Sequence, residues 1–353
     1  MTPELDRLMD AQAGVATARQ ADCFLANREA RRTLMKSGVL RELRHGALTS
    51  GVRWNAADHR GRHRLHLAGA LLLRNWSPDA ARHRYVGSHR TAAFLLDLRF
   101  EPDPTAVAMA RREHNLQNVS AEGAELLAEI AQIRRGEGPR NVDVIDGDRR
   151  RRTYGHHAHV RPATLPPEHV VLDHGVPITT MARTAVDLMR DGTRSDALIV
   201  ADGALFAGVE LAELREMAEF SARWANGLQA LETLALADGR AESAAESLAR
   251  FVCLEAAEIP EPEVQVDLYD AFGHIARVDL LFRRFRVVLE VDGLIKVTDP
   301  WCGDPEEAIR RQIARENRLR RAGWTVIRTT WEELVNYPNA LLSRLLAAFA
   351  QAA

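Results

Sequence analysis

The stretch that most constrains the fold is residues 274–296, HIARVDLLFRRFRVVLEVDGLIK, where apolar and charged side chains alternate around an arginine-rich turn. This alternation is typical of a β-hairpin, because successive side chains of a strand point to opposite faces. We expect the register that sets Asp279 opposite Glu290, since it forms a wholly apolar face from three pairs: Val278 with Val291, Leu280 with Leu289, and Phe282 with Val287. A slip of one residue would break that face, so the pattern itself favours this register.

The second face of the hairpin would carry Arg277, Asp279 and Leu281 opposite Asp292, Glu290 and Val288. The carboxylates of Asp279, Glu290 and Asp292 would then lie close together, where like charges repel unless a cation lies between them. Oxygen-rich clusters of this kind suit Mg²⁺ or Mn²⁺, so the pattern predicts a divalent metal site. It fits a solvated strand face equally well, with Asp292 paired to Arg277 across the ladder.

Composition and charge describe a globular protein with an uneven charge distribution. The chain has 353 residues, enough for about two or three domains, and is 46% apolar and 27% charged. The formal net charge of −2 alone implies no polyanionic partner. Basic residues dominate residues 1–99, however, and acidic residues dominate 241–292, which points to a basic N-terminal region that faces nucleic acid.

Three further features of the sequence predict a cytoplasmic protein without a membrane partner. The cysteines, Cys23, Cys253 and Cys302, form neither a disulfide framework nor a zinc-binding spacing, which fits a reducing compartment. The first residues do not resemble a signal peptide. The apolar run at residues 67–73 is also far too short to span a bilayer.

Residues 1–53 have the pattern of a winged helix-turn-helix. We expect short helices at residues 3–12, 18–24 and 27–38, followed by a small β-wing that turns at Gly46. The third helix and the wing carry the candidate nucleic-acid-binding residues: Arg28, Arg31, Arg32, Lys36, Arg41 and Arg44. A helix of such a motif enters the major groove while basic residues hold phosphates. The alternative is a basic helical module that docks another protein.

Residues 54–240 read as an α+β middle region without a catalytic arrangement. The region has no glycine-rich phosphate loop and no nucleophile elbow. His157 and His159 would share one strand face, which is a weak metal signal that we interpret as a polar face. Arg183 and Asp187 are four residues apart and are expected to pair on a helix surface.

Residues 241–353 are expected to form a helix, three strands, a helix, a strand and a closing helix broken near Pro338. The second of these helices carries Arg311, Arg315 and Arg318 on one face. These arginines are candidates for contacts with a nucleic-acid backbone. A solvated helix face is the alternative.

These C-terminal residues resemble the PD-(D/E)XK nuclease superfamily, and most closely its branch related to very-short-patch-repair (Vsr) endonucleases. The resemblance covers residues 242–334 and rests on Asp279, the run Glu290-Val291-Asp292-Gly293, the run Arg315-Glu316-Asn317-Arg318-Leu319, and Gly323-Trp324. It implies that Asp279 and Glu290 are paired metal ligands and that Glu246 is the acidic residue of the first core helix. The chain departs from the pattern where Asp292 replaces the usual lysine, a charge that Lys296 could supply, and where Gln312 and Ile313 replace a Glu-Lys pair.

The wider chain resembles actinobacterial AbiEi-family antitoxin-like proteins, through the N-terminal winged helix, residues 175–188 and the helix at 241–250. That resemblance implies operator binding and autoregulation beside a nucleotidyltransferase-like toxin. The fold class expected is mixed, multidomain α/β, with domains at residues 1–53, 54–240 and 241–353. Two functions follow: a Mg²⁺- or Mn²⁺-dependent nuclease acting on double-stranded DNA, or a non-catalytic antitoxin and autorepressor. The predicted catalytic residues are Glu246, Asp279, Glu290, Asp292 and Lys296, with Asp279, Glu290 and Asp292 as metal ligands.

Overall fold

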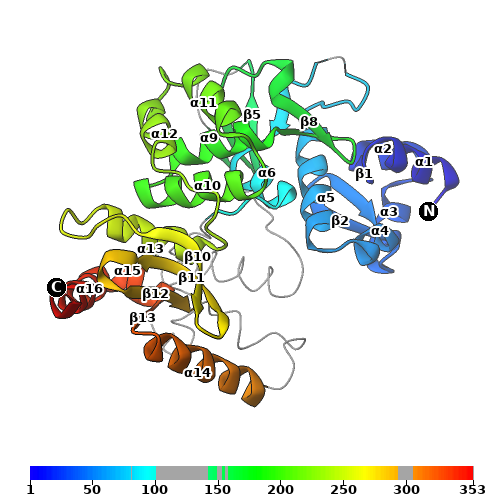
Figure 1. Ribbon diagram of the computed structural model, residues 1–353. Coiled ribbons are helices and arrows are strands. Elements are labelled where there is room, and N and C mark those ends of the chain that lie inside the picture. Colours follow the sequence, from blue (N-terminus) through cyan, green and yellow to red (C-terminus); the bar gives the residue numbers. More distant parts are fainter. Residues whose placement is uncertain (81, 101–141, 149–152, 156–157, 293–304, 353) are drawn as a thin grey trace, which may run out of the picture. The chain divides into compact units, whose positions relative to one another are not determined.

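The computed structural model describes residues 1–353 except 81, 101–141, 149–152, 156–157, 293–304 and 353. The chain forms two compact units, Met1–Leu188 and Met189–Ala353. Both units combine helices with β-sheets, which confirms the mixed α/β class (Figure 1). The finer domain boundaries after residues 53 and 240 stay predictions. None of the helices in the described parts of the chain is long and apolar enough to cross a membrane.

The first unit begins with helices around a three-stranded sheet of order β1-β3-β2. Its elements are α1 Pro3–Ala11, β1 Val15–Thr17, α2 Ala18–Phe24, α3 Arg28–Lys36, β2 Leu40–Arg44, β3 Ala47–Ser50 and α4 Gly51–Ala56. The side chains of Thr2, Thr17 and Asn27 cap the three predicted helices, which are confirmed. The glycine at the start of residues 14–17 predicts a short turn there, but β1 pairs with β3, with Val15 opposite Thr49.

The rest of the first unit is built on a six-stranded sheet of order β6-β7-β5-β4-β9-β8. Its elements are α5 His59–Leu72, β4 Tyr85–Gly87, α6 His89–Leu96, β5 Val142–Asp146, β6 Thr153–Gly155, β7 Ala158–Pro162, η1 Pro167–His169, β8 Val170–Asp173, β9 Val176–Thr179 and α9 Met181–Asp191. Leu67 and Leu71 of α5 are fully buried against Val144 and Ile178 of the sheet, so this helix forms the core with it. The sequence predicts one strand over residues 152–161, whereas the structure has an antiparallel pair there, β6 and β7. The sequence also predicts a helix that begins at Ser120, which lies outside the described residues.

The second unit contains helices and a four-stranded sheet of order β10-β11-β12-β13. Its elements are α10 Arg194–Phe206, α11 Leu211–Phe220, α12 Gly227–Leu234, α13 Ala244–Leu254, β10 Glu263–Asp270, β11 Gly273–Phe282, η2 Arg283–Phe285, β12 Val287–Asp292, α14 Pro305–Arg321, β13 Thr325–Thr330, α15 Trp331–Asn336 and α16 Pro338–Ala352. The predicted C-terminal order is confirmed, including the break before Pro338. Strands β10, β11 and β12 are antiparallel, whereas β13 runs parallel to β12.

The predicted hairpin register is confirmed where β11 and β12 pair: Leu280 with Leu289, Leu281 with Val288, and Phe282 with Val287. One face of the sheet packs Leu280 and Leu289 with residues of α13 and α16. The other face is also buried, because Leu281 and Val288 pack with Leu319 of α14. Val278, predicted on the face of Leu280, belongs to this second cluster. The carboxylates therefore lie on a sheet that has apolar packing on both faces.

Candidate functional site

Glu290, near the end of β12, is a charged residue that is buried. The residue is only 6% exposed, so its carboxylate has little contact with water. Its Oε2 accepts a hydrogen bond from Arg315 Nη2 of α14 at 2.5 Å. Its Oε1 is buried and has no hydrogen-bond partner among the residues that the structure describes. Burial, together with the nearby Asp279 carboxylate, raises the pKa of Glu290, although Arg315 and Arg328 act in the opposite direction.

Asp279 lies beside Glu290 and links three strands. Its Oδ2 accepts a hydrogen bond from the backbone nitrogen of Val291 at 2.8 Å, and its Oδ1 accepts one from Gln265 Nε2 at 3.4 Å. The first bond joins β11 to β12 just beyond the last paired residues of the ladder. The predicted proximity of Asp279 and Glu290 is therefore confirmed, and a solvated strand face does not describe Glu290.

Gln265 of β10 is a site residue that no sequence pattern indicates. Its backbone has φ +52°, in the left-handed region that side chains other than glycine rarely adopt. From this position its amide donates to Glu246 Oε2 at 2.7 Å as well as to Asp279, and its Oε1 accepts from Arg277 Nε at 2.7 Å. Gln265 thus connects Glu246 of α13 to the carboxylate of Asp279.

Glu246 caps the start of α13. Ser243 accepts a hydrogen bond from the Glu246 backbone nitrogen at 3.2 Å, and its hydroxyl donates to Glu246 Oε1 at 2.8 Å. Glu246 Oε2 accepts from the backbone nitrogen of Glu242 at 2.8 Å. Both carboxylate oxygens are thus engaged in a helix cap, a contact that orients Glu246 toward Gln265. Glu246 belongs to the predicted set, and the amide of Gln265 links it to Asp279.

Asp292 does not join the carboxylate pair, contrary to the prediction. It forms two hydrogen bonds with Arg328 of β13: Nε donates to Oδ2 at 2.8 Å, and Nη2 donates to Oδ1. The predicted pairing of Asp292 with Arg277 is also wrong, because Arg277 bonds to Glu242 and Gln265 instead. The reason is that β13 pairs in parallel with β12 and brings Arg328 alongside. Within the described ranges, no group of three or more His, Cys, Asp or Glu side chains could hold a metal ion. Lys296 lies outside those ranges.

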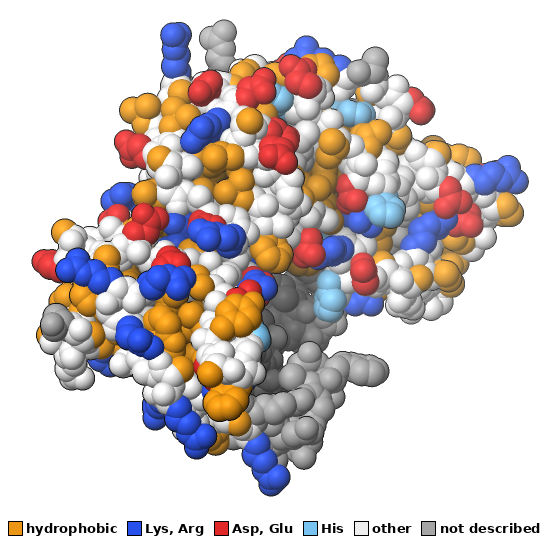
Figure 2. All heavy atoms as spheres, in the orientation of Figure 1, with side chains coloured by type: hydrophobic (Ala, Val, Ile, Leu, Met, Phe, Trp, Pro, Cys, Tyr) orange, Lys and Arg blue, Asp and Glu red, His pale blue; other side chains and the backbone are white. Residues whose placement is uncertain are grey.

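Two of the predicted arginines of α14, Arg315 and Arg318, bond to residues of the sheet. Arg318 donates to both carboxylate oxygens of Asp270, at 2.7 and 2.6 Å, and to the carbonyl oxygens of Gly273 and His274. It therefore fastens the β10–β11 turn to the helix. Arg315 bonds to Glu290, whereas the side chain of Arg311 lies outside the described residues. Figure 2 shows further basic side chains on the surface over α14.

The basic residues of the N-terminal module differ in exposure. Arg28, Arg32 and Lys36 are exposed along α3, a helix without any buried residue. Arg31 is held by Asp22 at 2.9 Å, and the guanidinium of Arg41 lies 4.3 Å from the ring centre of Trp54. These five residues stay candidates for nucleic-acid contact.

Arg44 was predicted to contact nucleic acid, but it is 6% exposed. Burial, and then the charge of Arg74, lowers the pKa of Arg44 to about 9. The cause is a shift in register between Glu42 and Arg44, where the β2–β3 ladder is irregular and the strand turns this side chain inward. Arg44 is therefore withdrawn from the nucleic-acid-binding set.

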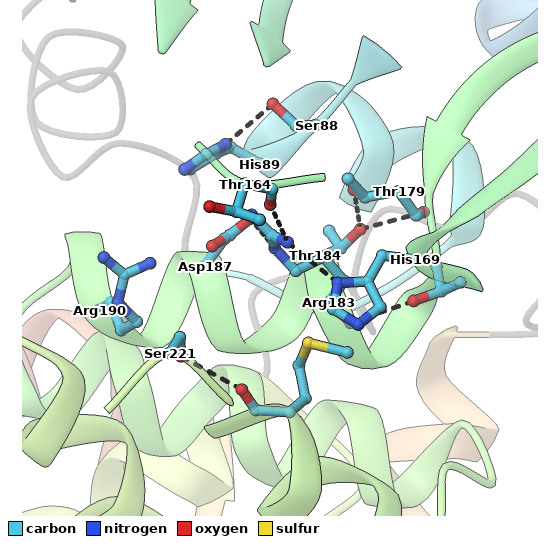
Figure 3. A network of polar contacts seen from close by, with 12 residues as sticks. Ser88, His89, Thr164, His169, Thr179, Arg183, Thr184, Asp187, Arg190 and Ser221 are labelled. Carbon is cyan, nitrogen blue, oxygen red and sulfur yellow. Dashed lines mark hydrogen bonds and ion pairs between the residues drawn. The ribbon is translucent and has the colours of Figure 1, made fainter. Parts of the chain in front are cut away.

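A second polar network lies inside the first unit, around Arg183 of α9 (Figure 3). Arg183 Nε donates to Asp187 Oδ2 at 2.7 Å, and Nη1 contacts the carbonyl oxygen of Thr164 and His169 Nδ1. The predicted pairing of Arg183 with Asp187 is confirmed, but both residues are buried, at 0% and 1% exposure, instead of lying on a helix surface. These contacts link α9 to the chain before η1 and serve the fold.

The other predicted polar feature of this unit concerns His157 and His159. His157 lies outside the described residues. His159 Nδ1 faces Asp143 Oδ1 at 3.6 Å, beside Arg161. Asp143 and Arg161 thus form an ion pair within the sheet, with His159 beside it.

Comparison with known proteins gives relatives without an assigned function. The chain matches no known protein-family model. It is 32% identical over 168 residues to the uncharacterized protein MT2308 of Mycobacterium tuberculosis strain CDC 1551 / Oshkosh. The uncharacterized protein Rv2248 of strain ATCC 25618 / H37Rv matches to the same extent. The match covers 47% of this chain and 59% of each relative.

Proposed function

We propose that this chain is a DNA-binding, divalent-metal-dependent nuclease of the PD-(D/E)XK type. The observation that carries the proposal is Glu290, a buried carboxylate with one oxygen lacking a partner among the described residues, beside a second carboxylate, Asp279. A buried carboxylate with one unpartnered oxygen among the described residues, next to a second acid, favours a cation between the two. Hard oxygen ligands of this kind fit Mg²⁺ or Mn²⁺.

The order of elements supports the same proposal. Helix α13, the strands β10, β11 and β12, helix α14 and strand β13 follow one another as in the resemblance described above. Asp279 lies on the middle strand and Glu290 on the next one, as the PD-(D/E)XK pattern requires. Asp292, at the position of the usual lysine, is bound to Arg328 and is not needed as a metal ligand in this proposal.

The protein's own side chains would each have a defined task in phosphodiester cleavage. Asp279 and Glu290 would hold the metal, which when bound would lower the pKa of a water molecule and neutralise charge on the phosphate. Gln265, anchored by Glu246, would keep Asp279 oriented. Lys296 would orient the attacking water or help to remove its proton.

The activity test is a plasmid-nicking assay of the full chain with Mg²⁺, Mn²⁺ or EDTA. We expect wild type to cleave with either metal and not with EDTA, and Asp279→Asn to be inactive. Asp267→Asn is the matched control. Asp267 is an exposed acid of the same sheet, and its side chain contacts His274 Nε2 at 2.9 Å. A metal-bound wild type that cleaves no DNA or RNA, single- or double-stranded, would exclude the nuclease.

The N-terminal module is proposed to bind double-stranded DNA. Its order of helix, strand, two helices and two strands, with sheet order β1-β3-β2, supports a winged helix. Arg28, Arg32 and Lys36, exposed on α3, would contact phosphates. Replacing all three with alanine should weaken duplex binding and lower the salt dependence by about one unit of slope per lost contact. Arg44→Ala should leave the slope unchanged; unaltered binding by the triple variant would indicate a protein-docking module.

A second candidate function is a non-catalytic AbiEi-type antitoxin and autorepressor that acts beside a nucleotidyltransferase-like toxin. The specific observation is that arginines already neutralise the acids, Arg315 on Glu290 and Arg328 on Asp292. A nuclease fold used only for binding would need no metal. Sequence-specific binding of the chain to its own promoter DNA, without Mn²⁺ binding or cleavage, would favour this function.

A further inference from the structure

We propose that Arg315 couples metal binding to nucleic-acid binding, by leaving Glu290 for a phosphate of the bound strand. The inference rests on the proposed nuclease function and adds that DNA binding precedes tight metal binding. Without DNA, the guanidinium of Arg315 holds the Glu290 carboxylate. When a phosphodiester draws Arg315 away, the carboxylate becomes available to a divalent cation.

The first support is that Arg315 and a metal would compete for one group. Arg315 Nη2 lies 2.5 Å from Glu290 Oε2, so it occupies one of the two oxygens that a cation could use. A guanidinium does not lose its proton in proteins, so it cannot become a neutral neighbour of a bound cation. Two positive groups on one buried carboxylate repel each other, and the tighter binding of one weakens the other.

The second support is the exposure of the two partners. The Glu290 side chain is 8% exposed, whereas the Arg315 side chain is 38% exposed. Glu290 is therefore fixed within the sheet, and Arg315 reaches it from a helix surface that is open to solvent. A guanidinium binds phosphate oxygens with two parallel hydrogen bonds, which makes a phosphodiester a strong competitor for Arg315.

The third support comes from the neighbouring arginines, which are anchored more firmly. Arg318 is held by both oxygens of Asp270 and by two backbone carbonyl groups. Arg328 is held by both oxygens of Asp292. For Arg315, in the part of the chain that the structure describes, the contact found is the single bond to Glu290. Of these three side chains, Arg315 is the one that can move with the fewest bonds broken.

Thermodynamic linkage gives the inference a measurable form. If DNA removes Arg315 from Glu290, DNA must raise the affinity for the metal, and the metal must raise the affinity for DNA by the same factor. The test is a calorimetric titration of the full chain with Mn²⁺, with and without a short duplex whose phosphorothioate linkages resist cleavage. A titration of the duplex alone is subtracted. The readout is metal affinity, which requires no turnover.

We expect the duplex to raise the Mn²⁺ affinity of wild type by about 5- to 150-fold, the usual range of coupling between sites. Arg315→Ala should bind Mn²⁺ more tightly than wild type without DNA, and the duplex should change its affinity by less than about twofold. Arg321→Ala removes an exposed positive charge from the same helix and should behave like wild type. Arg315→Gln keeps a long polar side chain and serves as a second variant in case Arg315→Ala folds poorly.

The outcomes separate this inference from the proposed function. Mn²⁺ binding that is equally DNA-dependent in wild type and in both Arg315 variants would overturn the coupling role of Arg315 and leave the nuclease proposal intact. Mn²⁺ binding by wild type that ignores the duplex would do the same. Failure of every protein to bind Mn²⁺, with or without the duplex, would overturn both the inference and the metal site on which it rests.

Discussion

Two buried carboxylates, one in each unit, lie at the same distance from an arginine and yet have opposite electrostatics. Asp143 Oδ1 in the first unit is 2.5 Å from Arg161 Nη1, and Glu290 Oε2 in the second is 2.5 Å from Arg315 Nη2. Burial alone would raise the pKa of Asp143, but the His159 hydrogen bond and the charges of Arg161, His89 and His159 outweigh it and lower that pKa to about 2. Burial and Asp279 raise the pKa of Glu290.

The difference shows that one ion pair does not define the state of a buried acid. Asp143 accepts a hydrogen bond from Arg161 and lies beside histidines, and its lowered pKa shows that the protein stabilises its charged form within the sheet. Glu290 has an arginine on one oxygen, no partner in the described residues on the other, and a like charge beside it. Groups of the second kind occur preferentially at functional sites, because a ligand can supply the compensation that the protein lacks.

The largest effect is expected when the acid of the second unit loses its charge. Glu290→Gln should abolish both Mn²⁺ binding and cleavage, because the cation loses a charged ligand. The measurement is the shift in unfolding temperature with added Mn²⁺, alongside the nicking assay. Asp143→Asn is the matched control and should retain the Mn²⁺ response. Equal Mn²⁺ responses from Glu290→Gln and wild type would remove the distinction between the two acids.

Removing the arginine partners should affect stability unequally. Arg161→Leu leaves Asp143 buried without its closest cation and should cost about 3–5 kcal/mol in the free energy of unfolding. Arg315→Leu should cost only about 1 kcal/mol or less, because the Arg315 side chain is 38% exposed and Glu290 can bind a proton instead. Urea unfolding of both variants measures these costs. A larger loss for Arg315→Leu would make Arg315 a structural residue like Arg161.

Lys296 is expected to provide a cationic group for the chemistry near Glu290, a prediction from the sequence alone. Lys296→Ala should lower the cleavage rate by about two orders of magnitude, because a positioned acid–base group contributes typically about 10²–10⁴-fold. Its Mn²⁺ affinity should stay close to that of wild type, since lysine is not a metal ligand. Single-turnover cleavage and calorimetry measure the two quantities. Full activity of Lys296→Ala would mean that another group, such as Arg315, supplies the charge.

The smallest expected effect is the loss of the stability contributed by Asp143 at acidic pH. The pKa of Asp143 in the folded chain, about 2, is below its ordinary value of 3.8. Its contribution to stability is therefore present above about pH 3.8 and is lost as the pH falls toward 2. Asp143→Asn should be less stable than wild type near neutral pH, and the difference should shrink through this window. Denaturant unfolding at a series of pH values measures it, and a constant difference would contradict the low pKa.

The sequence predicted the features that local patterns determine. The alternation in residues 274–296 was enough to predict the register of β11 and β12 and the proximity of Asp279 and Glu290. The three N-terminal helices were likewise predicted, because a helix cap such as Thr17 or Asn27 and its partner are neighbours in the chain.

The remaining features depend on contacts between distant parts of the chain. Asp292 was placed in the metal site because the position of β13, which brings Arg328, could not be read from the hairpin. Arg44 was placed on the surface because a ladder irregularity moves it inward. Gln265 had no pattern of its own, since its role comes from an unusual backbone conformation. Arg315 was selected for DNA, but its bond to Glu290 required the packing of α14 on the sheet.

The backbone conformation of Gln265 lowers the stability of the fold, whereas its side chain orients the Asp279 carboxylate. A side chain in the left-handed region costs roughly 1–2 kcal/mol, and glycine would avoid most of that cost. Glycine would also remove the amide that joins Glu246 to Asp279. Selection for stability alone would therefore favour glycine at residue 265, whereas selection for an oriented Asp279 carboxylate would keep glutamine. An engineered, more heat-resistant form of this protein that carries glycine there would be expected to bind Mn²⁺ less tightly at the proposed site.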